Sequence, residues 1–193
     1  GLAVGNGMEV SQSIKILAGE KGPEDFMRVL EVLSGQMIYL GGKARSAAEG
    51  SEKARAAIAD GSALEKFRLM VKWQGGDVRV VGDPDRFMPK AKLFKEIKAS
   101  RAGFLTAMEA RTVGLASVAL GAGRAKAEDA VDFGAGFILG KKPGDRVKPG
   151  DVIAGAYASS PARLAEGVKM FESSLAYGPK APRKEPLIKE IIK

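Results

Sequence analysis

The spacing of apolar residues changes once along this chain, close to residue 77. Before that point the apolar residues recur every three or four positions, which is the period of an amphipathic helix. After it the apolar runs are short and are bounded by glycine, proline and aspartate, a pattern typical of strands joined by tight turns. The change predicts an α+β chain with a helical first part and a β-rich second part.

The clearest helix is expected after Gly22-Pro23-Glu24-Asp25. Proline suits the first position of a helix, and two acidic residues suit its positive end. One continuous apolar stripe then follows at helical spacing and ends at Gly41-Gly42. The stripe consists of Phe26, Val29, Leu30, Leu33, Met37 and Leu40.

Three further helices are expected in the first 76 residues. The first covers residues 8–18, where apolar residues again have helical spacing. Ser46 stands three residues before Glu49, and this capping-box spacing predicts a helix start. The same spacing separates Ser62 from Glu65 and predicts another start.

The second part is predicted to contain strands and one closing helix. Strands are expected over residues 93–99, 103–108, 131–139 and 151–157, and a helix after Ser160-Pro161 whose apolar face ends at Leu175. The last fifteen residues are rich in proline and are expected to form a surface arm. We therefore predict three segments, a helical part over 1–76, a linker over 77–92 and a β-rich module with flanking helices over 93–193.

Composition excludes several kinds of chemistry and partner. The 193 residues contain neither cysteine nor histidine, so disulfides, thiolate metal sites, cysteine nucleophiles and histidine acid–base catalysis are excluded. No apolar run approaches the ~18 residues of a membrane span, and no signal peptide is recognisable, although the apolar start at Gly1 suggests that the chain begins within a longer protein.

The net charge of +8 is concentrated over residues 90–101 and after Gly178, where aromatic residues do not alternate with the cations. This pattern predicts a solvated basic surface and no nucleic-acid partner.

Residues 120–129 form a charged segment with a glycine hinge. Gly121 and Gly123 let the backbone turn at little steric cost, and Arg124 and Lys126 then offer two cations. Two interpretations remain open for this segment, a plain connector and a mobile loop beside a ligand.

No catalytic constellation is evident from the residues alone. The glycine-rich segment 134–142 lacks the phosphate-loop spacing, because Ala135 occupies the position of the first glycine. Lys142 likewise occupies the position where serine or threonine would bind magnesium. A glycine-kinked pair of strands explains this segment better.

Five motifs in order resemble the C-terminal portion of the pyrimidine-nucleoside phosphorylases, the thymidine phosphorylase family, from residue 1 to about Leu175. The motifs are Ala3-Val4-Gly5-Asn6-Gly7-Met8-Glu9-Val10, Gly22-Pro23-Glu24-Asp25, Asp60-Gly61-Ser62-Ala63-Leu64-Glu65-Lys66-Phe67, Gln74-Gly75-Gly76-Asp77 and Leu120-Gly121-Ala122-Gly123-Arg124. The segment from Gly144 to Asp151 looks like the family's C-terminal module, a relative of the biotinyl/lipoyl barrel-sandwich, but the lysine hairpin of true carriers is not visible.

The resemblance implies part of an α/β enzyme, a pentosyltransferase of nucleoside salvage. Such an enzyme converts a pyrimidine nucleoside and phosphate reversibly into the free base and a pentose 1-phosphate. The family's phosphate-binding and base-binding residues lie upstream, so no catalytic or substrate-binding residue is carried over, and this chain alone is expected to be inactive. The complete protein is expected to be a cytoplasmic homodimer with phosphate as co-substrate and no organic cofactor.

The resemblance also implies two peripheral sites. Gly121, Gly123 and Arg124 correspond to a family segment that closes over the cleft. Ala3, through its carbonyl, and Gln12, in place of a glutamate, correspond to a potassium site. A different class of function, a non-catalytic scaffold or binding module on the lipoyl-like barrel, stays open as the alternative.

Overall fold

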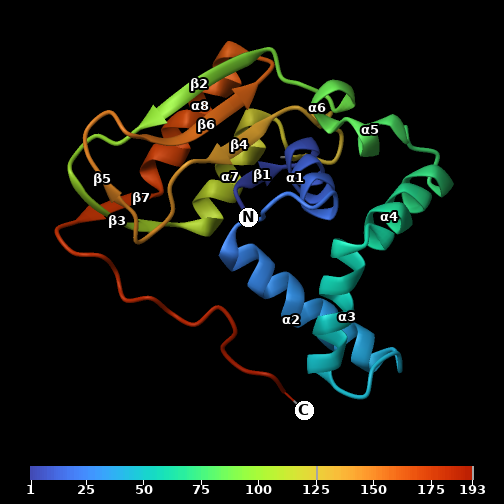
Figure 1. Cartoon of the computed structure of the whole chain (residues 1–193). Helices are drawn as coiled ribbons and strands as arrows, with labels where there is room; N and C mark the ends of the chain where they lie inside the picture. Colours follow the sequence, from blue (N-terminus) through green and yellow to red (C-terminus); the bar gives the residue numbers. More distant parts are fainter. Residues whose placement is uncertain (125, 193) are drawn as a thin grey trace. The chain divides into compact units, whose positions relative to one another are not determined.

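The computed structural model describes residues 1–124 and 126–192. These residues form helices and antiparallel strands, which confirms the predicted α+β class (Figure 1). The strands make two open sheets, and no closed barrel is found in the described part of the chain. The barrel-sandwich detail is therefore not confirmed.

The chain forms two compact units. We call Ser11–Phe87, together with Gly1 and the tail from Glu185, the helical unit. We call Leu2–Val10 and Met88–Lys184 the sheet unit. The predicted assignment of 1–76, 77–92 and 93–193 to parts of a larger enzyme stays a prediction.

The first 76 residues are helical apart from one short strand. The helices before residue 88 are α1 (Gly7–Leu17), α2 (Glu24–Leu40), α3 (Ala47–Ala59), α4 (Ser62–Trp73), α5 (Arg79–Gly82) and α6 (Pro84–Phe87). The predicted linker thus contains two single-turn helices. Asp77 and Asp83 accept hydrogen bonds from the backbone N–H groups of Arg79 (2.9 Å) and Arg86 (3.0 Å), which stabilises these short turns. No helix in the described residues is long and apolar enough to cross a membrane.

One of the two predicted capping boxes is only partly correct, and the other is wrong. The Ser46 hydroxyl accepts from the Glu49 backbone N–H (3.2 Å), while the Glu49 carboxylate accepts from the backbone of Arg45 (2.8 Å), one residue before the expected partner. Ser62 is already the first residue of α4, and its side chain does not cap the helix. Gly61, with φ of 78°, occupies the cap position instead, since glycine accepts this left-handed conformation.

Two glycines let α2 and α3 cross at short range. A Cβ atom on Gly50 would collide with the carbonyl oxygen of Gly35. On the same side of α2 the Glu31 carbonyl accepts from the Ser51 hydroxyl (3.0 Å), and the Glu31 carboxylate pairs with Arg55 (3.2 Å). The α3 helix therefore covers the face of α2 that carries Glu31 and Gly35.

The sheet unit contains both sheets (Figure 1). The four-stranded sheet has the order β1 (Ala3–Gly5), β4 (Gly136–Leu139), β6 (Val152–Ala158), β2 (Leu93–Lys98), and the three-stranded sheet has the order β5 (Arg146–Val147), β3 (Gly103–Met108), β7 (Leu175–Gly178). All neighbouring strands are antiparallel. The strand predicted over 131–139 is shorter than expected, and Leu175 begins β7 instead of lying on the preceding helix.

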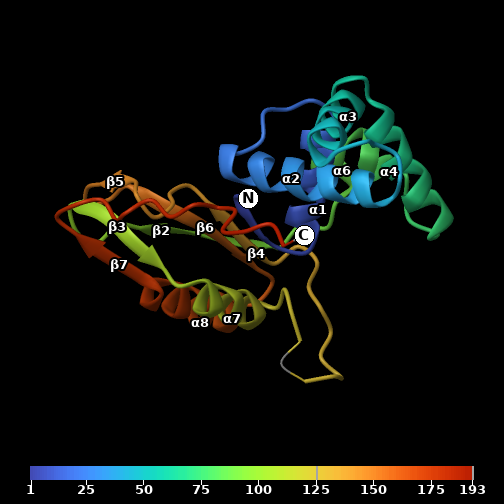
Figure 2. The ribbon, with the colours of Figure 1, turned by 90° about the horizontal axis from the view of Figure 1, so that it is seen from below.

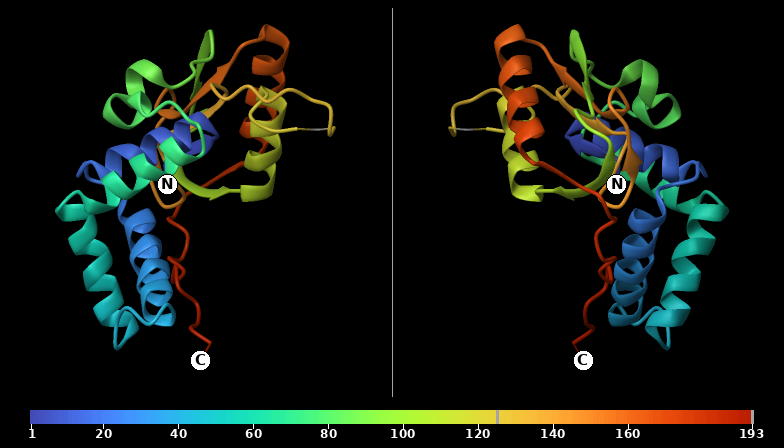
Figure 3. Two further views of the ribbon diagram at one scale, coloured as in Figure 1. Left: turned by 90° about the vertical axis from the view of Figure 1, so that its right-hand side faces the viewer. Right: turned by 90° about the vertical axis from the view of Figure 1, so that its left-hand side faces the viewer.

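Helices α7 (Ala110–Leu120) and α8 (Pro161–Ser173) lie side by side against the four-stranded sheet (Figures 2 and 3). The fully buried rings of Phe137 and Phe171 meet between β4 and α8, with centroids 4.6 Å apart. Gly167 lets α8 approach Leu120 of α7, since a Cβ there would lie 2.6 Å from the Leu120 Cγ. This packing fixes the end of α7, where the charged segment of residues 120–129 begins, which we call the candidate loop.

Candidate functional site

The candidate loop begins where α7 ends at Gly121. The Gly121 N–H donates to the Val118 carbonyl (2.9 Å), and the Ala122 N–H donates to the Ser117 carbonyl (3.0 Å). This pair of bonds is a Schellman motif, which needs a left-handed residue, and Gly121 has φ of 108°. The glycine predicted as a hinge is thus the cap that ends the helix.

The base of the loop is anchored by long-range hydrogen bonds within the sheet unit. The Gly121 carbonyl accepts from the Asp132 backbone N–H (2.9 Å), and the Asn6 side chain donates to the Ala122 carbonyl. The Gly7 backbone N–H donates to the Phe133 carbonyl (3.0 Å), in the segment that leads from the loop to β4. Both ends of the loop are therefore held to the unit.

The tip of the loop stands out from the sheet unit (Figures 2 and 3). Arg124, Lys126 and Glu128 are exposed there. Asp129 closes a local turn, because its carboxylate accepts from the Lys126 backbone N–H at 2.9 Å. Ala125, which belongs to the predicted loop, lies outside the described residues.

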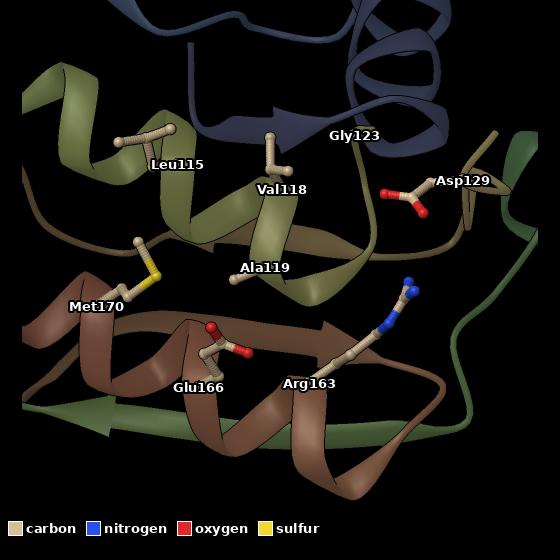
Figure 4. Close-up of a pocket in the computed structure, with 8 residues that line it drawn as sticks. All are labelled: Leu115, Val118, Ala119, Gly123, Asp129, Arg163, Glu166 and Met170. Carbon is tan, nitrogen blue, oxygen red and sulfur yellow. The ribbon is translucent and has the colours of Figure 1, made fainter. Parts of the chain in front are cut away.

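A pocket of about 320 Å³ lies between the loop and the outer faces of α7 and α8 (Figure 4). Its lining consists of Leu115, Val118 and Ala119 from α7, Gly123 and Asp129 from the loop, and Arg163, Glu166 and Met170 from α8. The Arg163 side chain extends from α8 toward Asp129 (Figure 4). It also passes Gly121, where a Cβ atom would lie 2.6 Å from Arg163 Nη1.

The charges of the lining limit what the pocket can hold. One guanidinium, from Arg163, faces two carboxylates, from Asp129 and Glu166. An isolated phosphate would meet more negative than positive charge here, so the lining does not make a phosphate site. An apolar wall with one planar cation and two acceptors suits a small polar molecule or a loop side chain instead.

The structure separates the predicted loop residues. Gly123 lines the pocket and Gly121 lies beside the lining residue Arg163, whereas Arg124 is exposed and does not line the pocket. Arg163, the cation that does line the pocket, was not predicted. The signal available in the sequence was the helical spacing of Arg163, Glu166 and Met170, which puts their side chains on one side of α8. That side lies away from the buried Val168 and Phe171.

The first turn of α7 is fixed by Glu109. Its carboxylate accepts from the Thr112 hydroxyl (2.6 Å) and from the backbone N–H groups of Arg111 (2.9 Å) and Thr112 (2.7 Å). These hydrogen bonds lower the pKa of Glu109 below its ordinary value, and the bond from the Thr112 hydroxyl has the largest effect. The helix that forms one wall of the pocket therefore carries a charged cap at its start.

The predicted potassium ligands lie in different units. Ala3 is in β1 of the sheet unit, opposite Ile138. Gln12 is a half-buried residue of α1 in the helical unit, and a Cβ atom on Gly1 would lie 2.7 Å from its Oε1. Both groups offer neutral oxygen atoms, which suit a hard cation. No group of three or more acidic, histidine or cysteine residues that could hold a metal occurs in the described residues, so the potassium assignment stays a prediction.

Residues 104–178, from β3 to β7, match the family model of the pyrimidine nucleoside phosphorylase C-terminal domain. This segment includes α7, the candidate loop and α8. The match assigns it to the class of pyrimidine nucleoside phosphorylase C-terminal domains. The chain is also 42% identical over 159 residues to the pyrimidine-nucleoside phosphorylase of Geobacillus stearothermophilus, covering 82% of this chain and 36% of that protein. It is 37% identical over 175 residues to the enzyme of the same name from Staphylococcus aureus (strain USA300), covering 91% of this chain and 40% of that protein.

These matches confirm the predicted resemblance, and the chain belongs to the pyrimidine-nucleoside phosphorylase family. The chain spans only about two fifths of the length of these curated relatives.

Proposed function

We propose that this chain is the C-terminal portion of an enzyme that carries out reversible phosphorolysis of pyrimidine nucleosides. The observation that supports this most directly is the C-terminal-domain match, which includes the whole candidate loop and both pocket helices. Similarity to the relatives extends over 82–91% of the chain and thus includes much of the helical unit. This extent favours part of an enzyme over a scaffold built on the sheet module alone.

In the proposed reaction a phosphate oxygen attacks C1′ of the sugar. The bond between C1′ and the base nitrogen breaks, and its electron pair leaves with the base. The enzyme is a pentosyltransferase whose main contribution is the placement of charge and of the two substrates. Phosphate and base contacts come from the part of the protein outside this chain, so residues 1–193 alone release no base.

This portion contributes a closing loop to the complete enzyme. Gly121 and Gly123 shape its base, and Arg124 is the exposed cation that reaches the substrates when the loop closes. The anchored base and exposed tip of the loop support this role. We assign to Arg163 the role of positioning the loop through Asp129, since its side chain extends toward that residue (Figure 4).

The Ala3 carbonyl and the Gln12 side-chain oxygen are each proposed, from the family resemblance, as a ligand that potassium would use. The ion would supply a fixed positive charge that orders the chain around it.

The complete protein is proposed to be a cytoplasmic homodimer. The finer barrel-sandwich relationship is supported only by the two Pro-Gly-Asp turns, in which Asp145 accepts from Lys142 (2.8 Å) and Asp151 from Lys148 (3.0 Å).

A chimera tests the proposal. This chain replaces the matched segment of the G. stearothermophilus relative, and the purified chimera is assayed with uridine and with thymidine. We expect phosphate-dependent release of the base from the chimera and none from residues 1–193. A folded chimera without activity contradicts the proposed function, and activity of the isolated chain contradicts the assignment of the active site to the remainder of the protein.

A further inference from the structure

The apolar stripe of α2 is exposed in its second half. Leu33, Met37 and Leu40 are 57%, 73% and 79% exposed. Their spacing of four and three residues places them on one side of the helix. Exposed apolar side chains in a continuous row are unusual on a free surface and mark interaction sites.

Neighbouring helix α3 does not cover this row. The contacts between the two helices involve Gly35 and Glu31 of α2. These residues lie on the opposite side of α2 from Leu33 and Met37, because two residues along a helix correspond to a rotation of about 200°. The stripe therefore has no partner within the α2–α3 pair.

The composition of this half of α2 also indicates a buried environment. Residues 32–42 contain no charged residue, and the last turn of α2 carries no basic residue. Lysine or arginine is favoured at the last turn of a helix that ends in water, because it complements the negative end of the dipole. The nearest cation, Lys43, lies beyond the helix end, where its backbone N–H donates to the Ile38 carbonyl (3.0 Å), so the apolar row itself carries no charge.

The helical unit has little core of its own. Among the described residues its buried apolar side chains are Ile14, Ile16 and Val81, whereas every member of the continuous buried core cluster belongs to the sheet unit. A helix pair with an apolar stripe must bury that stripe against another element to form a stable layer. The missing layer must come from elsewhere.

We propose that Leu33, Met37 and Leu40 form the docking surface for the part of the phosphorylase that precedes the segment matched by this chain. This inference rests on the proposed function. The relatives supply the reason for choosing this partner, because the chain spans only 36–40% of their length and the remainder is available to pack on it. The interface is apolar, and its partner surface is an uncharged helix or sheet face of that remainder.

Thiol labelling tests the proposal, since the chain contains no natural cysteine. Met37→Cys reports on the stripe, and Arg28→Cys reports on an exposed position on the opposite side of the same helix. Each variant is labelled in the 193-residue chain and in the chimera, with peptide-resolved mass spectrometry. We expect both sites to react quickly in the isolated chain, and only Met37→Cys to slow by at least roughly tenfold in the chimera, which corresponds to ~1.4 kcal/mol of protection.

Fast reaction of Met37→Cys in the folded chimera would overturn the proposal. Slow reaction already in the isolated chain would also overturn it, because a second copy or the sheet unit would then cover the stripe. Labelling does not depend on turnover, so the two proposals fail separately. A protected but inactive chimera contradicts only the proposed function, and an active chimera with a fast-reacting Met37→Cys contradicts only the docking surface.

Co-expression gives a second measurement that does not depend on the chimera. The tagged chain is co-expressed with the preceding part of the G. stearothermophilus relative, and retention of that part is compared between variants. Leu33→Gln combined with Met37→Gln should lower retention at least roughly tenfold, whereas Arg28→Gln should retain it as the unmodified chain does. Equal retention by the stripe variant, or no retention by the unmodified chain, counts against the docking surface.

Discussion

Gly121 is the residue on which the geometry of the candidate site depends most directly. Its φ of 108° is strained for any residue with a Cβ atom, and that atom would lie 2.6 Å from Arg163 Nη1. We expect Gly121→Ala to lower the free energy of unfolding by at least about 1–2 kcal/mol, measured by urea denaturation. Gly114→Ala in the same helix is the control, since its Cβ meets no atom within 4 Å. It should be neutral or stabilising by roughly 0.5–1 kcal/mol, and equal destabilisation by both variants would contradict this explanation.

Arg124 should affect turnover far more than stability. An exposed substitution usually changes the free energy of unfolding by less than ~0.5 kcal/mol. In the active chimera Arg124→Ala is expected to lower kcat or raise KM for phosphate or nucleoside, with almost no change in melting temperature. Lys126→Ala, another exposed loop cation, is the matched control. Unchanged kinetics of Arg124→Ala would show that the loop is only a connector.

The cap at Glu109 makes a specific contribution to the pH dependence of stability. Hydrogen bonds from Thr112 and Arg111 lower the pKa of the carboxyl group in the folded state. The stabilisation is therefore fully present above the ordinary value of 4.5 and is lost as the pH falls through the lowered folded value. The stability difference between the unmodified chain and Glu109→Gln should shrink as the pH falls below 4.5. A difference that is constant from pH 7 to pH 3 would contradict the role of the charged cap.

At the scale of elements, the crossing of α2 and α3 depends on Gly50. A Cβ atom there would collide with the Gly35 carbonyl, so a branched side chain must push the helices apart. We expect Gly50→Val to destabilise the helical unit by about 1–3 kcal/mol, measured by the loss of helical circular dichroism in urea. Ala48→Val, at an exposed position of the same helix, controls for the lower helix propensity of valine. Similar losses for both variants would show that the crossing tolerates separation.

Elements with strong local patterns could be predicted from the sequence, and elements defined by distant pairing could not. The apolar period predicted α2, and short apolar runs bounded by turn residues predicted β2, β3 and β6. The strands β1, β5 and β7 have only two to four residues each and exist because of partners far along the chain. Short strands of this kind carry too few residues for a period to be recognised.

The candidate site was predictable to the same limited degree. Gly121 and Gly123 stand out in the sequence because glycine is needed where the backbone turns. Arg163 could not be connected with them, because the connection arises only when α7 and α8 pack side by side. Conversely, the stripe of α2 was predicted correctly as a pattern, but the pattern cannot say which surface covers it.

At the scale of the whole molecule, the unequal cores predict unequal stability. The continuous buried cluster lies in the sheet unit, while the helical unit buries few apolar side chains. We therefore expect hydrogen exchange in the isolated chain to show lower opening free energies for α2, α3 and α4 than for β4, β6, α7 and α8. Phe171→Ala should lower only the second group, by about 3–5 kcal/mol, because its ring packs on Phe137 inside the sheet unit.

The same measurement in the chimera connects this stability difference to the docking surface. If the remainder of the phosphorylase covers Leu33, Met37 and Leu40, the amides of α2 should gain protection there, and Leu33→Gln with Met37→Gln should remove that gain. The sheet unit should keep its protection in every case, which makes it the internal reference. Coincident exchange of all helices and strands in the isolated chain would contradict this picture. It would mean that the two units unfold as one cooperative structure and that the exposed stripe does not weaken the helical unit.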